Sequence, residues 1–295
     1  MGRASVQRNP ARAHALRWHM RSLPRRVKYC KGSTIAAHAD YQRYARLLRR
    51  RRDSVSVRPA SLTIVVTSAG RLPYLKQTVE SLRDNLEPGG FESVTWAIID
   101  DDPTATETRD WIQKHGHFDT RIFPSRNLRL GGALNTVLLR VGTEYVFHSE
   151  DDWQYLRPLH LQRFAELLCN SSLMASQILA YREPIVSIEK EYQGARTVSP
   201  GLGAVLDYSF NPHMFRLAHY LEYGPIPVFR REEEDYSEKL KALSSHRPYI
   251  YDYLRSPMVR HIGYESKLFQ GRQWPQRSAE WVANQYRRHE AQGGK

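Results

Sequence analysis

Strands that alternate with helices between residues 61 and 153 constrain the fold more than any other feature of this sequence. A continuous β-branched run covers residues 62–67, and further apolar runs cover residues 94–99 and 144–148. Apolar side chains at helical spacing lie between these runs, as in residues 73–85. Strands that are buried on both faces and joined by helices form parallel sheets. The sequence therefore predicts an α/β fold of the Rossmann-like type, with a mostly parallel sheet and helices on both faces.

The pattern becomes less regular after Trp153, where helices and loops are expected. Two halves of one domain are predicted, over residues 59–153 and 154–295. A short strand is also expected at residues 121–123. Further helices are expected over residues 107–115, 158–169 and 278–290, and one more helix is expected to end near residue 141.

The positive charge of the chain lies almost entirely in a basic N-terminal extension, residues 1–58. The whole chain has 44 Lys and Arg against 31 Asp and Glu, a net charge of +13. The extension alone contains 16 basic and 2 acidic residues, so the rest is close to neutral. Tyr41, Tyr44 and Leu48 recur at helical spacing before four consecutive arginines. This pattern predicts a basic amphipathic helix, which caps the main domain, contacts an anionic membrane surface or binds nucleic acid.

Cysteine content and hydropathy limit the cellular compartments in which this protein is expected. The only cysteines, Cys30 and Cys169, are far apart and have no metal-binding spacing, which argues against a disulfide framework. No run approaches the roughly 20 apolar residues of a membrane span, and the basic start lacks the apolar segment of a secretory signal. We therefore expect a cytoplasmic protein, with peripheral membrane contact or an organellar transit peptide as alternatives.

Two acidic clusters directly follow predicted strands. Asp100-Asp101-Asp102 ends the second strand and Glu150-Asp151-Asp152 ends the third. In open α/β sheets, ligands bind beyond the carboxyl ends of the strands. Carboxylates there suit Mg²⁺ or Mn²⁺ that bridges a diphosphate, whereas the alternative is a solvated acidic turn. If the extended backbone continues, Glu150 and Asp152 point one way and Asp151 the other.

The order of these motifs resembles the GT-A glycosyltransferases, in particular family-2-like enzymes. The polar stretch Thr67-Ser68-Ala69-Gly70-Arg71 follows the first strand, and Thr104 follows the aspartates of the second. Asn127, Gly132 and Asn135 surround the next helix, and Glu150-Asp151-Asp152 is the DxD-like motif. The segments Phe210-Asn211-Pro212-His213-Met214-Phe215-Arg216, Glu234-Asp235-Tyr236-Ser237-Glu238-Lys239-Leu240 and Val259-Arg260-His261-Ile262-Gly263 resemble later motifs.

This resemblance implies a metal-dependent, inverting transferase that moves a sugar from a UDP- or GDP-linked donor to a carbohydrate or other hydroxyl acceptor. Residues 59–153 would bind the nucleotide sugar, and residues 154–295 would bind the acceptor. The implied metal ligands, for Mn²⁺ or Mg²⁺, are Asp152 and His261. The implied catalytic base is Asp235, with Glu234 second. The implied nucleotide-sugar-binding residues are Thr67, Ser68, Arg71, Asp100, Asp101, Asn135, Glu150 and Asp151.

Two other functions remain compatible with the residues. A nucleotidyltransferase could use the same crevice and carboxylates, but it normally needs a Gly-rich basic loop after the first strand. The loop here offers only Gly70 and Arg71. A nucleic-acid-binding protein could act through the basic extension, in which case binding would depend steeply on salt.

Overall fold

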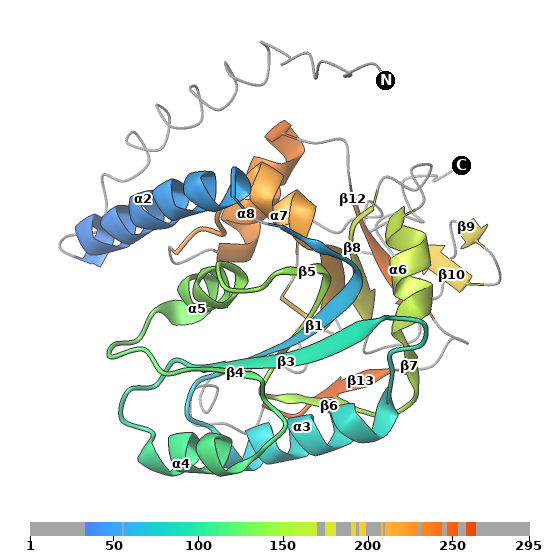
Figure 1. Ribbon diagram of the computed structural model, residues 1–295, viewed down its shortest axis with the longest axis horizontal. Helices are drawn as coiled ribbons and strands as arrows, with labels where there is room; N and C mark the ends of the chain where they lie inside the picture. The colour runs from blue at the N-terminus through green and yellow to red at the C-terminus, as the bar shows by residue number, and fades with distance from the viewer. Residues whose placement is uncertain are drawn as a thin grey trace, which may run out of the picture.

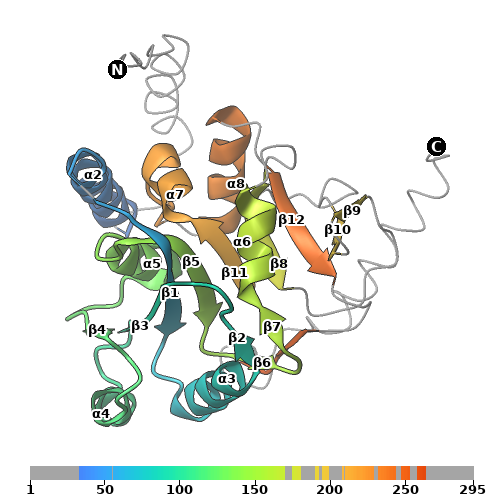
Figure 2. The ribbon, with the colours of Figure 1, turned by 45° about the vertical axis from the view of Figure 1, so that its right-hand side comes forward.

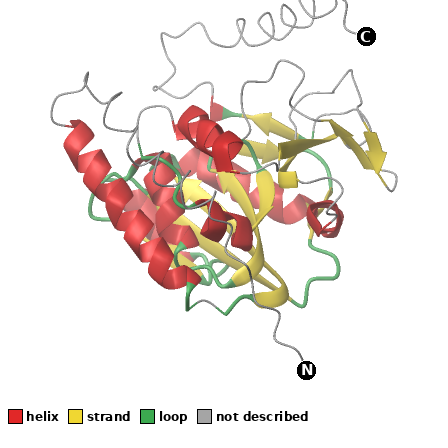
Figure 3. Cartoon of the chain, turned by 90° about the horizontal axis from the view of Figure 1, so that it is seen from above, coloured by secondary structure: helices red, strands yellow, loops and turns green. Residues whose placement is uncertain are grey.

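A nine-stranded sheet flanked by helices forms the centre of the molecule (Figure 1 and Figure 3). The computed structural model describes residues 33–54, 56–169, 175–180, 190–192, 195–198, 208, 210–228, 232–243, 247–252 and 258–263. The strand order is β4-β3-β1-β5-β11-β8-β12-β10-β9. Its strands are β1 (Arg58–Ser68), β3 (Ser93–Asp100), β4 (Thr120–Ile122), β5 (Thr143–Glu150), β8 (Ala175–Ala180), β9 (Lys190–Tyr192), β10 (Ala195–Val198), β11 (His213–Arg216) and β12 (Arg247–Asp252). The helix predicted at residues 278–290 lies outside the described residues.

The first half of the sheet is parallel, as predicted. β1 pairs with β3 on one side and with β5 on the other, and β3 pairs with β4. The register places Thr67 opposite Glu150 and Ser68 opposite Asp100. Because parallel strands end at the same edge, both acidic clusters begin at the same level on either side of β1.

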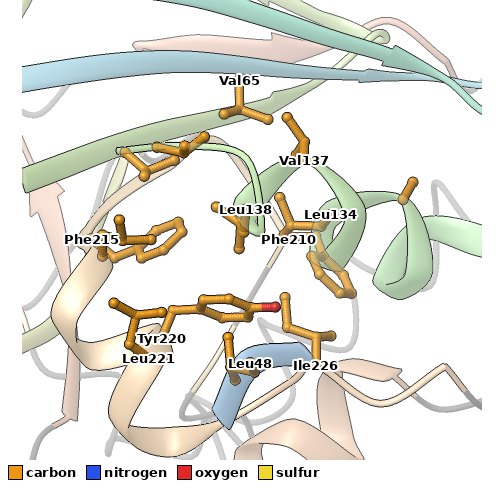
Figure 4. Packing of buried hydrophobic residues seen from close by; sticks show 14 of the residues in the cluster. Leu48, Val65, Leu134, Val137, Leu138, Phe210, Phe215, Tyr220, Leu221 and Ile226 are labelled. Atoms are coloured by element: carbon orange, nitrogen blue, oxygen red, sulfur yellow. The ribbon is translucent and has the colours of Figure 1, made fainter. Parts of the chain in front are cut away.

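The two faces of β1 bury side chains under different helical layers. Val66 packs with α3 (Leu72–Asn85) and α4 (Thr106–Lys114). Val65 points the other way, toward α5 (Arg129–Leu138) and α7 (Leu217–Tyr223) (Figure 4). Burial on both faces is the reason why residues 64–66 of this strand are apolar in succession rather than alternating with polar residues.

The second half of the sheet departs from the prediction of helices and loops. β11 runs antiparallel to β5, with His213 opposite His148, and β8 and β12 extend the sheet beyond it (Figure 2). β11 has four residues, too few for a clear alternation of apolar and polar side chains. The helix predicted at 158–169 is confirmed as α6 (Leu161–Cys169), which packs over β8 and β11.

Two small sheets and a helix complete the second half. β13 (Val259–His261) pairs antiparallel with β6 (Trp153–Tyr155), next to α3. β2 (Leu86–Glu87) pairs with β7 (Leu159–His160). α8 (Glu232–Leu243) packs against α7 and carries the acidic residues predicted to open a helix.

The amphipathic helix predicted in the basic extension is confirmed as α2 (Ser33–Arg52). It lies along α5 and α7 at the edge of the domain (Figure 1 and Figure 2). Tyr41, Tyr44 and Leu48 are buried, and the Tyr44 hydroxyl lies 2.8 Å from Thr136 Oγ1. Leu48 reaches the core beside Tyr220 (Figure 4). The helix therefore caps the main domain. No helix among the described residues combines the length and the apolar character needed to cross a membrane.

Candidate active site

The loop that follows β1 joins the two acidic clusters. The backbone amide of Ala69 donates a hydrogen bond to Asp151 Oδ2 (3.1 Å), and the amide of Gly70 donates to Asp100 Oδ1 (2.9 Å). Gly70 has φ +76°, and a Cβ there would lie 2.7 Å from the Cβ of Ala105. Only glycine fits this position without strain. Since β1 lies between β3 and β5, its loop is the element that can reach both clusters.

Arg71 bridges the two aspartates that follow β5. Its Nη1 donates to Asp152 Oδ2 (2.6 Å), and its Nη2 donates to Asp151 Oδ1. Both carboxylates are buried, and the Arg71 side chain is 18% exposed. The predicted alternation of the acidic triplet is wrong, because β5 ends at Glu150 and the next two residues form a turn. The turn lets Asp151 and Asp152 meet the same guanidinium group.

His261 approaches Asp152 from β13, so the structure brings together the two predicted metal ligands. His261 Nε2 lies 3.3 Å from Asp152 Oδ2, and the amide of Ile262 donates to the Asp152 carbonyl (2.8 Å). A Cβ at Gly263 would lie 2.3 Å from Asp152 Oδ2, so this backbone closes over the carboxylate. Burial opposes ionisation of Asp152, but His261 and Arg71 outweigh it and hold its pKa below the usual value.

Glu150 and Glu233 are close enough for their charges to interact. Burial, together with the charges of Asp152 and Glu233, raises the pKa of Glu150 well above its usual value. Glu233 belongs to the first turn of α8, where its Oε1 accepts a hydrogen bond from the amide of Phe210 (2.6 Å). From the sequence, Asp235 is the expected catalytic base, with Glu234 second. Asp235 is half-buried one residue beyond Glu234, whose side chain lies outside the described part of the structure.

The aspartates after β3 are held by backbone amides. Asp100 is fully buried. Its Oδ1 accepts the hydrogen bond from the Gly70 amide, and its Oδ2 lies 3.5 Å from the Arg109 Nε. Asp101 Oδ1 accepts from the amide of Leu128 (2.5 Å), and burial raises the pKa of Asp101 to about 6. Asp102 Oδ1 binds the amide and hydroxyl of Thr104. Asp100 therefore connects the strand ends, and Asp101 faces the start of α5.

Thr67 belongs to a buried network beneath the site rather than to its surface. Its Oγ1 lies 3.0 Å from His148 Nε2, and the His148 ring packs edge-on against His213 at 5.2 Å. His213 Nδ1 donates to the Asn211 carbonyl (2.7 Å), which leaves Nε2 to accept from the Tyr208 hydroxyl at 3.3 Å. Burial lowers the pKa of His213 to about 4 and the pKa of His148 well below its usual value, so both rings are neutral near pH 7. Sequence reasoning missed this network.

Asn135 and Ser68 also point into the protein. The Asn135 amide donates to the Ile226 carbonyl (2.7 Å), and its oxygen accepts from the Ile226 amide and the Tyr220 hydroxyl, both at 2.9 Å. Asn135 is fully buried, so it fastens the segment after α7 to α5 instead of lining a ligand site. Ser68 is buried at the end of β1, next to Asp100.

The donor groups around Asp152 fit a divalent cation. Asp152 Oδ1 is buried and has no hydrogen-bond partner among the described residues, while His261 Nε2 lies 3.3 Å from Oδ2 and the charge of Asp152 reaches Glu150. No preassembled cluster of three or more His, Cys, Asp or Glu ligands exists within the described residues. Such a site suits Mg²⁺ or Mn²⁺, which need only one or two protein carboxylates when substrate phosphates and water supply the remaining ligands.

The chain is similar to one protein family in sequence and to several solved structures in fold. The sequence model of glycosyl transferase family 2 matches residues 63–232. Solved structures with a similar fold include residues 1–349 of Staphylococcus aureus TarS, with 14% sequence identity and a TM-score of 0.49 over 66% of this chain and 59% of that one. The mannosyltransferase PcManGT from Pyrobaculum calidifontis, solved with GDP-Man and Mn²⁺, has 14% identity and a TM-score of 0.46 over 74% of this chain and 67% of that one. No curated protein sequence matches the chain.

The family model begins in β1, includes both acidic clusters and ends at the first residue of α8. The match thus covers the loop of Arg71, the turn of Asp151 and Asp152, and the buried network beneath them. Because the matched residues make up more than half of the chain, this protein belongs to glycosyl transferase family 2.

Proposed function

We propose that this protein transfers a sugar from a nucleoside-diphosphate sugar to an acceptor hydroxyl, with inversion, at the carboxyl edge of β1, β3 and β5. The Asp152 carboxylate carries this proposal. It is buried at the edge where α/β sheets bind ligands, its Oδ1 is unpartnered among the described residues, its Oδ2 lies 3.3 Å from His261 Nε2, and its charge reaches Glu150. Unpartnered buried carboxylate oxygens are costly to a fold, so a functional reason is the better explanation.

The same carboxylate supports a proposed metal site. Asp152 and His261 would hold Mn²⁺ or Mg²⁺, and Glu150 would assist them. A cation bound there supplies electrostatic stabilisation of the departing diphosphate. Arg71 adds a positive charge at Asp152 Oδ2.

A carboxylate of α8 is proposed as the general base. Glu233 is favoured over the residues chosen from the sequence, Asp235 and Glu234, because the Phe210 amide fixes its Oε1 and its charge reaches Glu150. The acceptor oxygen attacks the anomeric carbon, the bond from that carbon to the diphosphate oxygen breaks, and the acceptor proton moves to the carboxylate. This single displacement inverts the anomeric centre.

A donor screen tests the function. The purified protein is mixed with Mn²⁺ and a panel of UDP- and GDP-sugars, including the UDP-GlcNAc and GDP-Man bound in structures of TarS and PcManGT. We expect release of nucleoside diphosphate from at least one donor and a rise in melting temperature with the matching diphosphate. Turnover of nucleoside triphosphates, with no response to any sugar nucleotide, would instead indicate a nucleotidyltransferase.

The outer face of α2 is proposed to contact an anionic lipid surface. Arg43, Arg46 and Arg50 are exposed at i, i+3 and i+7, so they form one stripe that points away from the domain. Leu47 beside them is 37% exposed, and an apolar side chain among arginines suits a membrane interface better than a nucleic-acid backbone. Membrane contact would place the site near a lipid-linked or surface-bound acceptor.

A further inference from the structure

Arg71 stands between two buried carboxylates in the way that a bound cation would. Asp151 has both oxygens engaged, by the Ala69 amide and by Arg71. Asp152 shares Oδ2 between Arg71 and His261, and only Oδ1 is left for another ligand. The positive charge at this turn is thus part of the chain.

The choice of arginine matters for this arrangement. Its planar guanidinium group offers two nitrogens to two different carboxylates, which the single ammonium of lysine cannot match. Arginine also keeps its charge at any relevant pH. The pair of carboxylates is therefore neutralised in part before any metal ion binds, and the buried turn does not depend on a metal to fold.

The same guanidinium opposes a free divalent cation at Asp152. The guanidinium and the cation would both interact with the Asp152 carboxylate, and two positive charges on one carboxylate repel each other in a poorly solvated site. A nucleoside diphosphate changes this balance, because it brings negative charge that attracts the guanidinium and the cation together. Metal and nucleotide then favour each other's binding, and this coupling is reciprocal.

We propose that Arg71 is a built-in counter-cation, which weakens the binding of a free divalent metal at Asp152 and makes metal binding depend on the nucleotide. The inference rests on the proposed function in one respect, namely that Asp152 holds a metal next to a diphosphate. It adds that the site selects the metal–nucleotide complex over the metal alone.

A salt bridge with a purely structural role would look similar, so the test needs a matched control. Arg109 provides one, because its guanidinium lies 3.5 Å from the buried carboxylate of Asp100, at the end of the neighbouring strand. Arg71→Met and Arg109→Met each remove a guanidinium group from a buried carboxylate. Only the first removes it from the proposed metal ligand.

The experiment measures Mn²⁺ binding through the loss of the electron paramagnetic resonance signal of free Mn²⁺. Wild type, R71M and R109M are titrated with Mn²⁺ alone and with Mn²⁺ plus UDP or GDP. For R71M we expect Mn²⁺ alone to bind about tenfold more tightly than to wild type, within the usual range of coupling between sites. We also expect the nucleotide to increase Mn²⁺ affinity less in R71M than in wild type, and R109M to match wild type.

Equal Mn²⁺ affinity of R71M and wild type without nucleotide would overturn the counter-cation role while leaving the metal site in place. Absence of Mn²⁺ binding in every protein, with and without nucleotide, would overturn both this inference and the proposed metal site. If R71M fails to fold, Arg71→Gln replaces it, because the amide can still donate to one carboxylate without carrying charge. The same increase in Mn²⁺ affinity is expected for R71Q.

Discussion

The two sides of the site are built in different ways. At the carboxyl edge of β1 and β5, position is set by strand register and by an ion pair among buried groups, Arg71 with Asp151 and Asp152. At the start of α8, the half-buried Glu232 accepts a hydrogen bond from the Gly131 amide (2.9 Å), and the half-buried Glu233 accepts one from the Phe210 amide (2.6 Å). The first side is a rigid frame, whereas the second is fastened by carboxylates that can change protonation.

This difference fits a reaction in which the donor is charged and the acceptor is neutral. A diphosphate and a cation need fixed charges whose positions do not relax during the reaction. Deprotonation of an acceptor hydroxyl needs a carboxylate that can take up a proton. Substitutions on the first side should therefore abolish transfer, while substitutions on the second should show pH dependence.

The largest effect is expected from Asp152→Asn. It removes the negative charge beside His261 but keeps the shape of the side chain, so kcat/KM should fall by about 1,000-fold, near the upper range for loss of one electrostatic contact. Mn²⁺-dependent activity assays with the donor found in the screen measure it. Asp102→Asn is the matched control, because Asp102 Oδ1 accepts its hydrogen bonds from the amide and hydroxyl of Thr104 in the same turn, so this variant should keep near-normal activity. Full activity of D152N would remove Asp152 from the mechanism.

Glu233→Gln should give the next largest effect. Loss of a general base costs about 100-fold or more in kcat, and the amide can still accept the hydrogen bond from Phe210. KM for the donor should change little, since the donor lies on the other side of the site. Asp235→Asn and Glu234→Gln are measured in parallel. If D235N loses more kcat than E233Q, the assignment made from the sequence is the better one.

Glu232 allows a prediction on stability rather than rate. Burial raises its pKa from 4.5 to about 7, so the folded state favours the protonated carboxyl. The stabilisation is complete below pH 4.5 and is lost as the pH rises through about 7. Glu232→Gln, which cannot ionise, should therefore raise the free energy of unfolding by about 1–2 kcal/mol at pH 8 and leave it nearly unchanged at pH 4.5. Denaturant melts at the two pH values measure the difference, and an equal change at both would contradict the prediction.

The sequence predicted the first side of the site better than the second. Long buried strands and the acidic residues at their ends carry a strong local signal, so β1, β3 and β5 were expected within a few residues of their actual bounds. The partner of Arg71 could not be predicted, because it depends on the turn that replaces extended backbone after Glu150. Nor could the role of Glu233, since four consecutive acidic residues open α8 and only tertiary contacts choose among them.

The roles of the buried polar residues were still harder to predict from the sequence. His148 lies among apolar residues in a strand, and its partner His213 lies in a strand of four residues that shows no clear periodicity. Asn135 was assigned to the nucleotide because of its motif, yet its amide fastens Ile226. A polar residue beside a glycine pair gives the same local pattern whether it faces a ligand or the core.

The smallest effect on the domain is expected from the outer face of α2. Combined Arg43→Gln, Arg46→Gln and Arg50→Gln leaves the buried contacts of the helix intact, so the free energy of unfolding should change by no more than about 0.5 kcal/mol. Binding to phosphatidylserine vesicles, measured by co-sedimentation, should weaken by at least about tenfold, because each basic residue near such a surface contributes about 1 kcal/mol. Neutralising the exposed Arg83, Lys114 and Arg140 is the control and should change vesicle binding less. If wild type instead binds duplex DNA but not the vesicles, and the α2 variant loses the DNA binding, the partner of this helix is nucleic acid.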